Sequence, residues 1–175
     1  MERKKRTLIH NTYPIILGID PGYGRVGIAI IKNERGNQKL IHSECFETDK
    51  KLPHSKRLLL IGEKIKEIIK KYEPNKVALE TLLWSKNVKT AMQVAEARGV
   101  ILLEAARAKI FICEYNPNQI KLAVTGYGKS DKKQIINMVE KLLKLKNKKR
   151  LDDEYDAIAT ALTCAVISLS TDMLA

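Results

Sequence analysis

The feature that most constrains the fold is residues 76–80, a short run that is apolar from Val77 to Leu79 and ends on Glu80. A short run without alternating polar residues is typical of a strand buried on both faces of a sheet. Such a sheet needs helices on both sides, so the sequence predicts an α/β fold. A carboxylate that ends a buried strand is costly unless it is paired or binds a metal ion, which makes Glu80 a candidate site residue.

Other runs supply the remaining layers. Residues 15–19 and 26–31 are apolar runs separated by Pro-Gly-Tyr-Gly-Arg, which predicts a β-hairpin, and residues 39–46 predict a third strand. Residue patterns predict helices over 55–72, 88–108, 117–125 and 151–168. A short apolar run predicts a strand over 110–115. A capping residue, Ser130 or Asp131, predicts the start of a further helix that ends at about residue 145. This order predicts a mixed sheet with helices on both faces, in a single domain over 14–170 that follows a basic arm over 1–13.

The chain carries a large excess of positive charge. Its 32 Lys and Arg residues outnumber its 20 Asp and Glu residues, which gives a formal net charge of +12. This charge favours an anionic partner, most often nucleic acid, although a lysine-rich surface also serves solubility or thermal stability. No segment has the apolar length needed to span a bilayer, and the three cysteines are widely spaced in apolar stretches, as buried thiols of a reducing compartment are. We therefore expect a cytoplasmic protein without a membrane partner.

Four acidic residues are placed so that they can converge. Asp20 and Glu80 each end an apolar run, and they reach one edge of the sheet if their strands run side by side in the same direction. Asp153 and Asp156 lie three residues apart on one helix face. Clustered carboxylates need cations between them, and two Mg²⁺ ions about 4 Å apart suit phosphodiester cleavage. In a basic chain, this pattern indicates a metal-dependent nuclease.

Each acidic motif also has a structural interpretation. Asp20-Pro-Gly is a common turn sequence. Asp152, Asp153 and Glu154 stabilise the dipole of a helix that begins there. Asp152 lies four residues before Asp156, so it rivals Asp153 for a place in the cluster.

The segments around these acids resemble the RuvC family of Holliday junction resolvases. The matching stretches occur in order between about residue 15 and about residue 166. They are Ile-Leu-Gly-Ile-Asp-Pro-Gly-Tyr-Gly-Arg-Val-Gly at 16–27, Ala-Leu-Glu at 78–80, Ser-Lys-Asn-Val-Lys-Thr-Ala at 85–91, Ala-Glu-Ala-Arg-Gly-Val at 95–100, Gln-Ile-Lys-Leu-Ala-Val-Thr-Gly-Tyr-Gly-Lys-Ser-Asp-Lys-Lys-Gln at 119–134 and Asp-Glu-Tyr-Asp-Ala-Ile-Ala at 153–159.

The resemblance implies an RNase H-like fold and a homodimer that nicks four-way DNA junctions symmetrically, in recombination and repair, with Mg²⁺ or Mn²⁺. It implies the RuvA–RuvB branch-migration complex as a further partner. The metal ligands that it implies are Asp20, Glu80, Asp153 and Asp156, and its Asp-x-x-Asp-Ala spacing favours Asp153 over Asp152. It also marks Lys121 and Lys132 as basic residues near the scissile phosphate.

One departure from the family concerns the base-stacking residue. The family carries an aromatic residue three positions after the central glutamate, where this chain has Leu83, followed by Trp84. Three interpretations remain open: Trp84 stacks on the bases, Leu83 acts as an apolar wedge, or Trp84 is a plain packing residue. The other expected DNA contacts are Lys86, Asn87, Lys89, Lys129 and Lys133.

Three other classes of protein compete with this interpretation. A ribonuclease H or a YqgF-like resolvase shares the carboxylates, but we do not expect it to carry the 121–134 and 153–159 stretches together. A non-catalytic junction-binding protein would leave all four carboxylates idle. Gly-Ile-Asp-Pro-Gly also resembles the phosphate loop of sugar kinases and actin-like ATPases, but their two lobes need a longer chain.

Overall fold

The computed structural model describes residues 13–34, 37–81, 88–145 and 149–172. Its centre is a mixed sheet of five strands in the order β3-β2-β1-β4-β5. The strands are β1 (Ile15–Asp20), β2 (Arg25–Glu34), β3 (Asn37–Glu47), β4 (Lys76–Glu80) and β5 (Phe111–Tyr115). The helices are α1 (His54–Tyr72), α2 (Val88–Arg107), α3 (Pro117–Thr125), α4 (Lys132–Leu142) and α5 (Asp152–Asp172).

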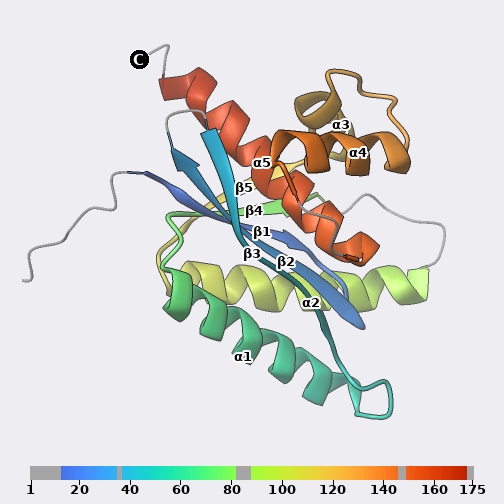
Figure 1. The fold of residues 1–175 in the computed structure, drawn as a ribbon. Coiled ribbons are helices and arrows are strands. Elements are labelled where there is room, and N and C mark those ends of the chain that lie inside the picture. The colour runs from blue at the N-terminus through green and yellow to red at the C-terminus, as the bar shows by residue number, and fades with distance from the viewer. Residues whose placement is uncertain (1–12, 35–36, 82–87, 146–148, 173–175) are drawn as a thin grey trace, which may run out of the picture.

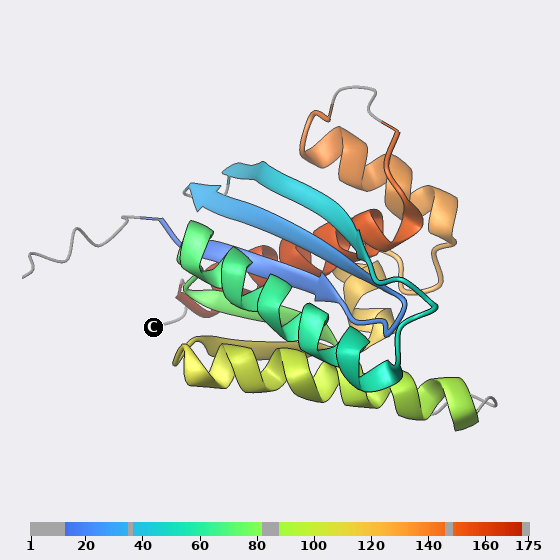
Figure 2. The same ribbon diagram turned by 90° about the horizontal axis from the view of Figure 1, so that it is seen from below.

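Helices cover both faces of this sheet, as the sequence predicts. In Figure 1, α5 lies across one face with α3 and α4 beside it, and α1 and α2 lie on the opposite face. The view from below shows α1 and α2 in front of the strands (Figure 2). Two hydrophobic clusters fill the two layers, one around α5 and one between the sheet and the α1–α2 pair.

The alternation of side chains along β1 and β4 decides which way their terminal acids point. In β1, Leu17 and Ile19 pack into the α1–α2 layer, so Asp20 emerges on the α5 side. In β4, Val77 and Leu79 pack into the same α1–α2 layer, so Glu80 also emerges on the α5 side. The fully buried residues from Val77 to Leu79 confirm that β4 is covered on both faces.

The pairing of β1 with β4 brings these two acids to one edge. The strands run parallel and side by side, and Ile19 of β1 is in register with Leu79 of β4. The next residue of each strand is the acid, so both carboxylates leave the sheet at the same level. The side-by-side arrangement on which the predicted convergence depends is therefore confirmed.

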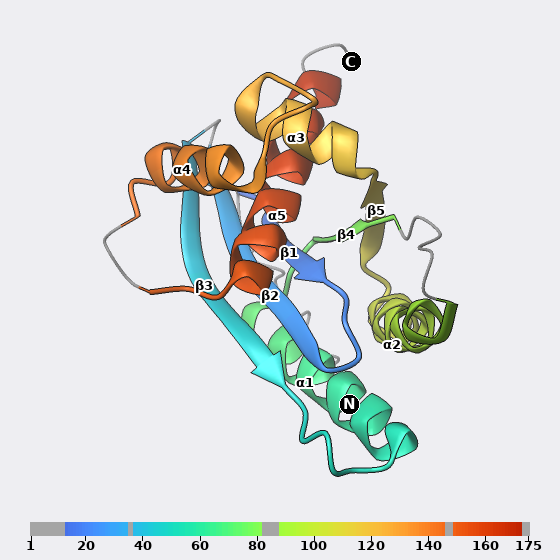
Figure 3. The same cartoon turned by 90° about the vertical axis from the view of Figure 1, so that its right-hand side faces the viewer.

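Two glycines let α5 approach the sheet closely. A Cβ atom added at Gly18 of β1 would lie 2.3 Å from the carbonyl oxygen of Ala157. One added at Gly27 of β2 would lie 1.9 Å from the carbonyl oxygen of Asp153. The first turns of α5 are thus held directly over the strands that lead to and from Asp20, an arrangement that Figure 3 shows from the side.

Several element boundaries differ from the predicted ones. The helix α4 ends at Leu142 rather than near residue 145, because the backbone turns into the left-handed region at Lys144. Strands β2 and β3 extend beyond their apolar runs because their antiparallel pairing continues to Glu34 and Asn37. Of the two candidate caps, Asp131 is the N-cap of α4. No helix in the described ranges is both long and apolar enough to cross a bilayer.

We expect Gly27→Ala to lower the free energy of unfolding by about 1–3 kcal/mol, because the added methyl group forces α5 away from β2. Urea unfolding measures this change. Gly128→Ala is the matched control, since a Cβ at Gly128 would meet only the Asn118 carbonyl oxygen, at 3.9 Å. A Gly27→Ala protein as stable as the control would show that α5 does not need this close approach.

Candidate active site

Four carboxylates gather where β1 and β4 end beneath the first turns of α5. Asp20 and Glu80 come from the strand ends, and Asp153 and Asp156 come from the helix. Asp20 interacts electrostatically with each of the other three. The structure therefore brings together all four acids that the sequence singles out.

Burial and mutual repulsion make this cluster difficult to ionise fully. Burial raises the pKa of Asp20 from 3.8 to about 7, with further contributions from the negative charges of Asp156, Glu80 and Asp153. The pKa values of Glu80 and Asp156 are also raised, in both cases chiefly by burial. A cluster of this kind favours any cation that enters it, because the cation offsets both effects.

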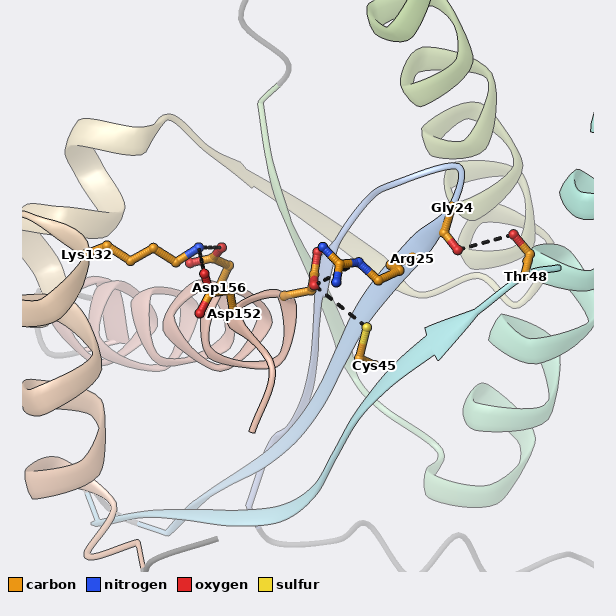
Figure 4. Close-up of polar contacts among 8 residues, drawn as sticks. Gly24, Arg25, Cys45, Thr48, Lys132, Asp152 and Asp156 are labelled. Carbon is orange, nitrogen blue, oxygen red and sulfur yellow. Dashed lines mark hydrogen bonds and ion pairs between the residues drawn. The ribbon is translucent and has the colours of Figure 1, made fainter. Parts of the chain in front are cut away.

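Lys132 supplies part of that positive charge. Its Nζ atom lies 3.0 Å from Oδ2 of Asp156 and 3.2 Å from Oδ2 of Asp152, as Figure 4 shows. Burial alone would lower the pKa of Lys132, but these hydrogen bonds outweigh it and raise the pKa above the usual value. Lys132 is therefore a charged group on the rim of the cluster.

A cleft of about 270 Å³ opens beside the cluster. Glu80 and Asp156 line it together with Lys121 and Lys132. Lys121 is close enough to Glu80 to oppose the rise in that residue's pKa. Both predicted basic residues thus share a cleft with carboxylates, which is the arrangement needed to hold a phosphate between ammonium groups and metal ligands.

Asp153 and Asp152 occupy different surroundings. The side chain of Asp153 is 20% exposed, whereas that of Asp152 is 68% exposed. Asp153 contributes to the raised pKa of Asp20, and Asp152 is not among the causes of that shift, whereas both residues raise the pKa of Asp156. This geometry favours Asp153 as the fourth member of the cluster.

Two neighbours of Asp153 escaped the sequence analysis. The Nε atom of Arg25 lies 3.3 Å from Oδ2 of Asp153, and the thiol of Cys45 lies 3.8 Å from the same oxygen. The only sequence signal for Arg25 is its place in the turn after Asp20. The expectation that all three thiols are buried is wrong, since only Cys164 is; Cys45 lies on the edge strand β3, and Cys113 on the edge strand β5.

The turn between β1 and β2 has its own support, which the sequence analysis also missed. The hydroxyl of Thr48 donates to the carbonyl oxygens of Tyr23 and Gly24, at 3.1 and 3.2 Å, and Figure 4 shows the Gly24 contact. The buried Arg57 donates from Nε to this hydroxyl at 2.9 Å, and its guanidinium lies over the Tyr23 ring. These contacts fix the chain that follows Asp20.

Most of the residues predicted to contact DNA have side chains that the structure does not describe. Leu83, Trp84, Lys86 and Asn87 lie outside the described residues, and the side chain of Lys89 is likewise not described. The other two, Lys129 and Lys133, are exposed but are not among the residues that line the carboxylate cleft.

The donor set suits a hard divalent cation such as Mg²⁺ or Mn²⁺, because every candidate ligand is a carboxylate. Across the described ranges, no group of three or more His, Cys, Asp or Glu side chains is arranged so that it could hold a metal ion. Asp156 instead turns to Lys132, and Asp153 turns to Arg25. The high pKa of Asp20 is the observation that fits a cation here.

Comparison with known proteins identifies the family. The family model for crossover junction endodeoxyribonuclease RuvC matches residues 16–164. The chain belongs to the RuvC family. RuvC of Petrotoga mobilis is 48% identical over 147 residues, which cover 84% of this chain and 90% of that protein. RuvC of Thermosipho melanesiensis is 44% identical over 151 residues, 86% of this chain and 96% of the other.

Solved structures of RuvC share the fold. RuvC of T. thermophilus in complex with a Holliday junction substrate matches with a TM-score of 0.85 and 29% identity, over 90% of this chain and 96% of that one. The yeast mitochondrial resolvase Ydc2 matches with a TM-score of 0.65 at 13% identity, over 89% and 80% of the two chains, which shows the fold alone. The predicted RNase H-like fold class is confirmed.

The raised pKa of Asp20 makes the metal-free protein less stable as the pH rises. The stability that the protonated carboxyl gives is fully present below 3.8 and is lost as the pH passes about 7, the pKa in the folded state. A shift of this size corresponds to at most about 4 kcal/mol. We expect Asp20→Asn to be more stable than the wild type in EDTA at about pH 8, with the difference shrinking towards about pH 5.

Urea unfolding at the two pH values measures this effect. Asp49→Asn, at an exposed position outside the cluster, is the control and should follow the wild-type pH dependence. Identical pH dependence of wild type and Asp20→Asn would contradict the repulsive cluster.

Proposed function

We propose that this chain is a Holliday junction resolvase that acts in the cytoplasm as a metal-dependent, structure-selective DNA endonuclease. The observation that carries the proposal is the carboxylate cluster at the ends of β1 and β4, in a member of the RuvC family. The net charge of +12 supports a polyanionic substrate. The junction-bound relative from T. thermophilus supports a four-way junction in particular.

Asp20, Glu80, Asp153 and Asp156 are the proposed ligands of two Mg²⁺ or Mn²⁺ ions. Ions held by these residues would supply the Lewis acidity that activates a water nucleophile and stabilises the departing 3′ oxygen of the cleaved strand. Lys121 and Lys132 hold the scissile phosphate in the cleft and stabilise the negative charge that develops on its oxygens. Lys132 is suited to this role because it already borders the cluster through Asp156.

Outside the cleft, the residues proposed to bind DNA are Lys86, Asn87, Lys89, Lys129 and Lys133. Their phosphate contacts hold the junction without reading its sequence. We propose that Trp84 stacks on the opened bases, and the alternative is that Leu83 acts as an apolar wedge. Both residues follow Glu80 closely in the chain, which supports a position near the cleaved strand.

A homodimer is the proposed assembly, because a protein with two-fold symmetry suits a junction that is nicked symmetrically. The helix α2 is the proposed interface. Met92 and Leu103 on this helix are 60% and 49% exposed, and Ala95 and Gly99 between them are exposed and small enough for close helix packing. The RuvA–RuvB branch-migration complex is the proposed partner that delivers the junction.

We expect the protein to nick a mobile four-way junction in Mg²⁺ or Mn²⁺ and to stop in excess EDTA, because the carboxylates need the cation. The assay compares linear duplex, RNA–DNA hybrid and four-way substrates of the same sequence. A preference for the hybrid would favour a ribonuclease H instead. Junction binding without cutting in any metal would favour a non-catalytic binding protein. Undiminished cutting in EDTA would reject metal dependence.

Asp153→Asn and Asp152→Asn form a matched pair that tests the fourth ligand. We expect Asp153→Asn to lower the cleavage rate by about 100-fold or more, since even indirect partners of a metal contribute 10–100-fold. Asp152→Asn should change the rate less than about 5-fold, because it removes only an exposed ion pair with Lys132. Single-turnover cleavage at saturating protein measures both. The reverse order of effects would transfer the ligand role to Asp152.

A further inference from the structure

Asp153 is anchored from the side of the neighbouring strands. Arg25, the first residue of β2, is in ion-pair contact with Oδ2, and the thiol of Cys45 on β3 approaches the same oxygen. Both contacts use Oδ2. This oxygen of the carboxylate is therefore held from the side of β2 and β3.

We propose that Arg25 is a positioning residue that fixes the Asp153 carboxylate so that its Oδ1 atom faces Asp20 and the metal site. This inference rests on the proposed function, because it assumes that Asp153 is a metal ligand. Residues that hydrogen-bond to metal ligands from behind fix ligand orientation in many metalloenzymes.

The backbone alone does not provide this orientation. The contact at Gly27 fixes the main chain of Asp153 on β2, because the carbonyl oxygen of Asp153 fills the space that a Cβ atom would need. The side chain can still rotate about its own bonds, and the nearby carboxylates of Asp20 and Asp156 repel it. The adjacent guanidinium of Arg25 offsets that repulsion through its ion pair with Oδ2.

Cys45 is the weaker of the two anchors. Its thiol lies on β3 and donates to Oδ2 of Asp153. A thiol is a weak donor, and its sulfur is 3.8 Å from the oxygen. Arg25 therefore provides most of the positioning, and the loss of the thiol alone has a small effect.

The exposure of Arg25 suggests a competing role in DNA binding. Its side chain is 52% exposed, so it is accessible to a phosphate of the bound junction. A pure phosphate contact contributes to junction affinity in the absence of metal and to its dependence on salt. A positioning role instead changes the affinity for metal in the absence of DNA. Junction affinity without metal and metal affinity without DNA therefore distinguish the two roles.

The experiment uses the full chain and two substitutions, Arg25→Gln and Arg25→Lys. Mn²⁺ binding to the free protein is measured by calorimetry, and the Mn²⁺ concentration that half-saturates junction cleavage is measured in parallel. We expect Arg25→Gln to weaken Mn²⁺ binding and to raise the half-saturating concentration by about 10–100-fold. Arg25→Lys should recover part of both losses, because it keeps the charge beside Asp153. Junction affinity in EDTA should change little.

Lys39→Gln is the matched control. Lys39 is also an exposed cation in an ion pair, with Oε2 of Glu34 at 2.7 Å, and it lies on the edge strand β3 opposite Lys32, at the end of the sheet away from Asp20. The control should bind Mn²⁺ and cut the junction as the wild type does.

The outcomes separate this inference from the proposed function. Wild-type protein that neither binds Mn²⁺ nor cuts a junction would overturn both. If the wild type does both and Arg25→Gln has the same Mn²⁺ affinity, the positioning role alone is overturned. Loss of metal-free junction affinity with unchanged Mn²⁺ binding would assign Arg25 to the DNA instead.

Discussion

The direct contact of α5 with β1 and β2 is the constraint on which the site depends. It exists because Gly18 and Gly27 leave no side chain between the helix and the strands. The contact places the first turns of α5 over the end of β1, so Asp153 and Asp156 lie above a strand that ends in Asp20. A larger residue at either glycine would lift the helix and separate its acids from those of the sheet.

The same close packing creates the electrostatic character of the site. Carboxylates that are pressed together and partly buried resist ionisation, as the raised pKa of Asp20 shows. Lys132 and Arg25 compensate by pairing with Asp156 and Asp153 at opposite ends of the acidic group. Part of the negative charge of the cluster is therefore already offset by cationic side chains.

Much of the fold was predictable because its strands and helices have strong local patterns. The apolar run before Glu80 identifies a buried strand, and the capping box at Asp131 marks the start of α4. The ends of β2 and β3 were not predictable, because pairing extends them through polar residues that carry no pattern of their own. Arg25 and Arg57 were missed for a related reason, since their partners come from separate elements and an arginine gives no local sign of what it will contact.

The sequence by itself determined the α/β class, the placement of the candidate acids at strand ends and at a helix start, and the resemblance to the RuvC family. Those features reside in hydrophobic period, residue type and spacing, which the chain carries before it folds. Only the tertiary structure decided that β1 and β4 are in register at Ile19 and Leu79, and that the side chain of Asp153 is more buried than that of Asp152. It also decided that Arg25 lies beside Asp153. The physical reason is that strand pairing and helix packing set these distances, and both depend on contacts between residues far apart in the chain.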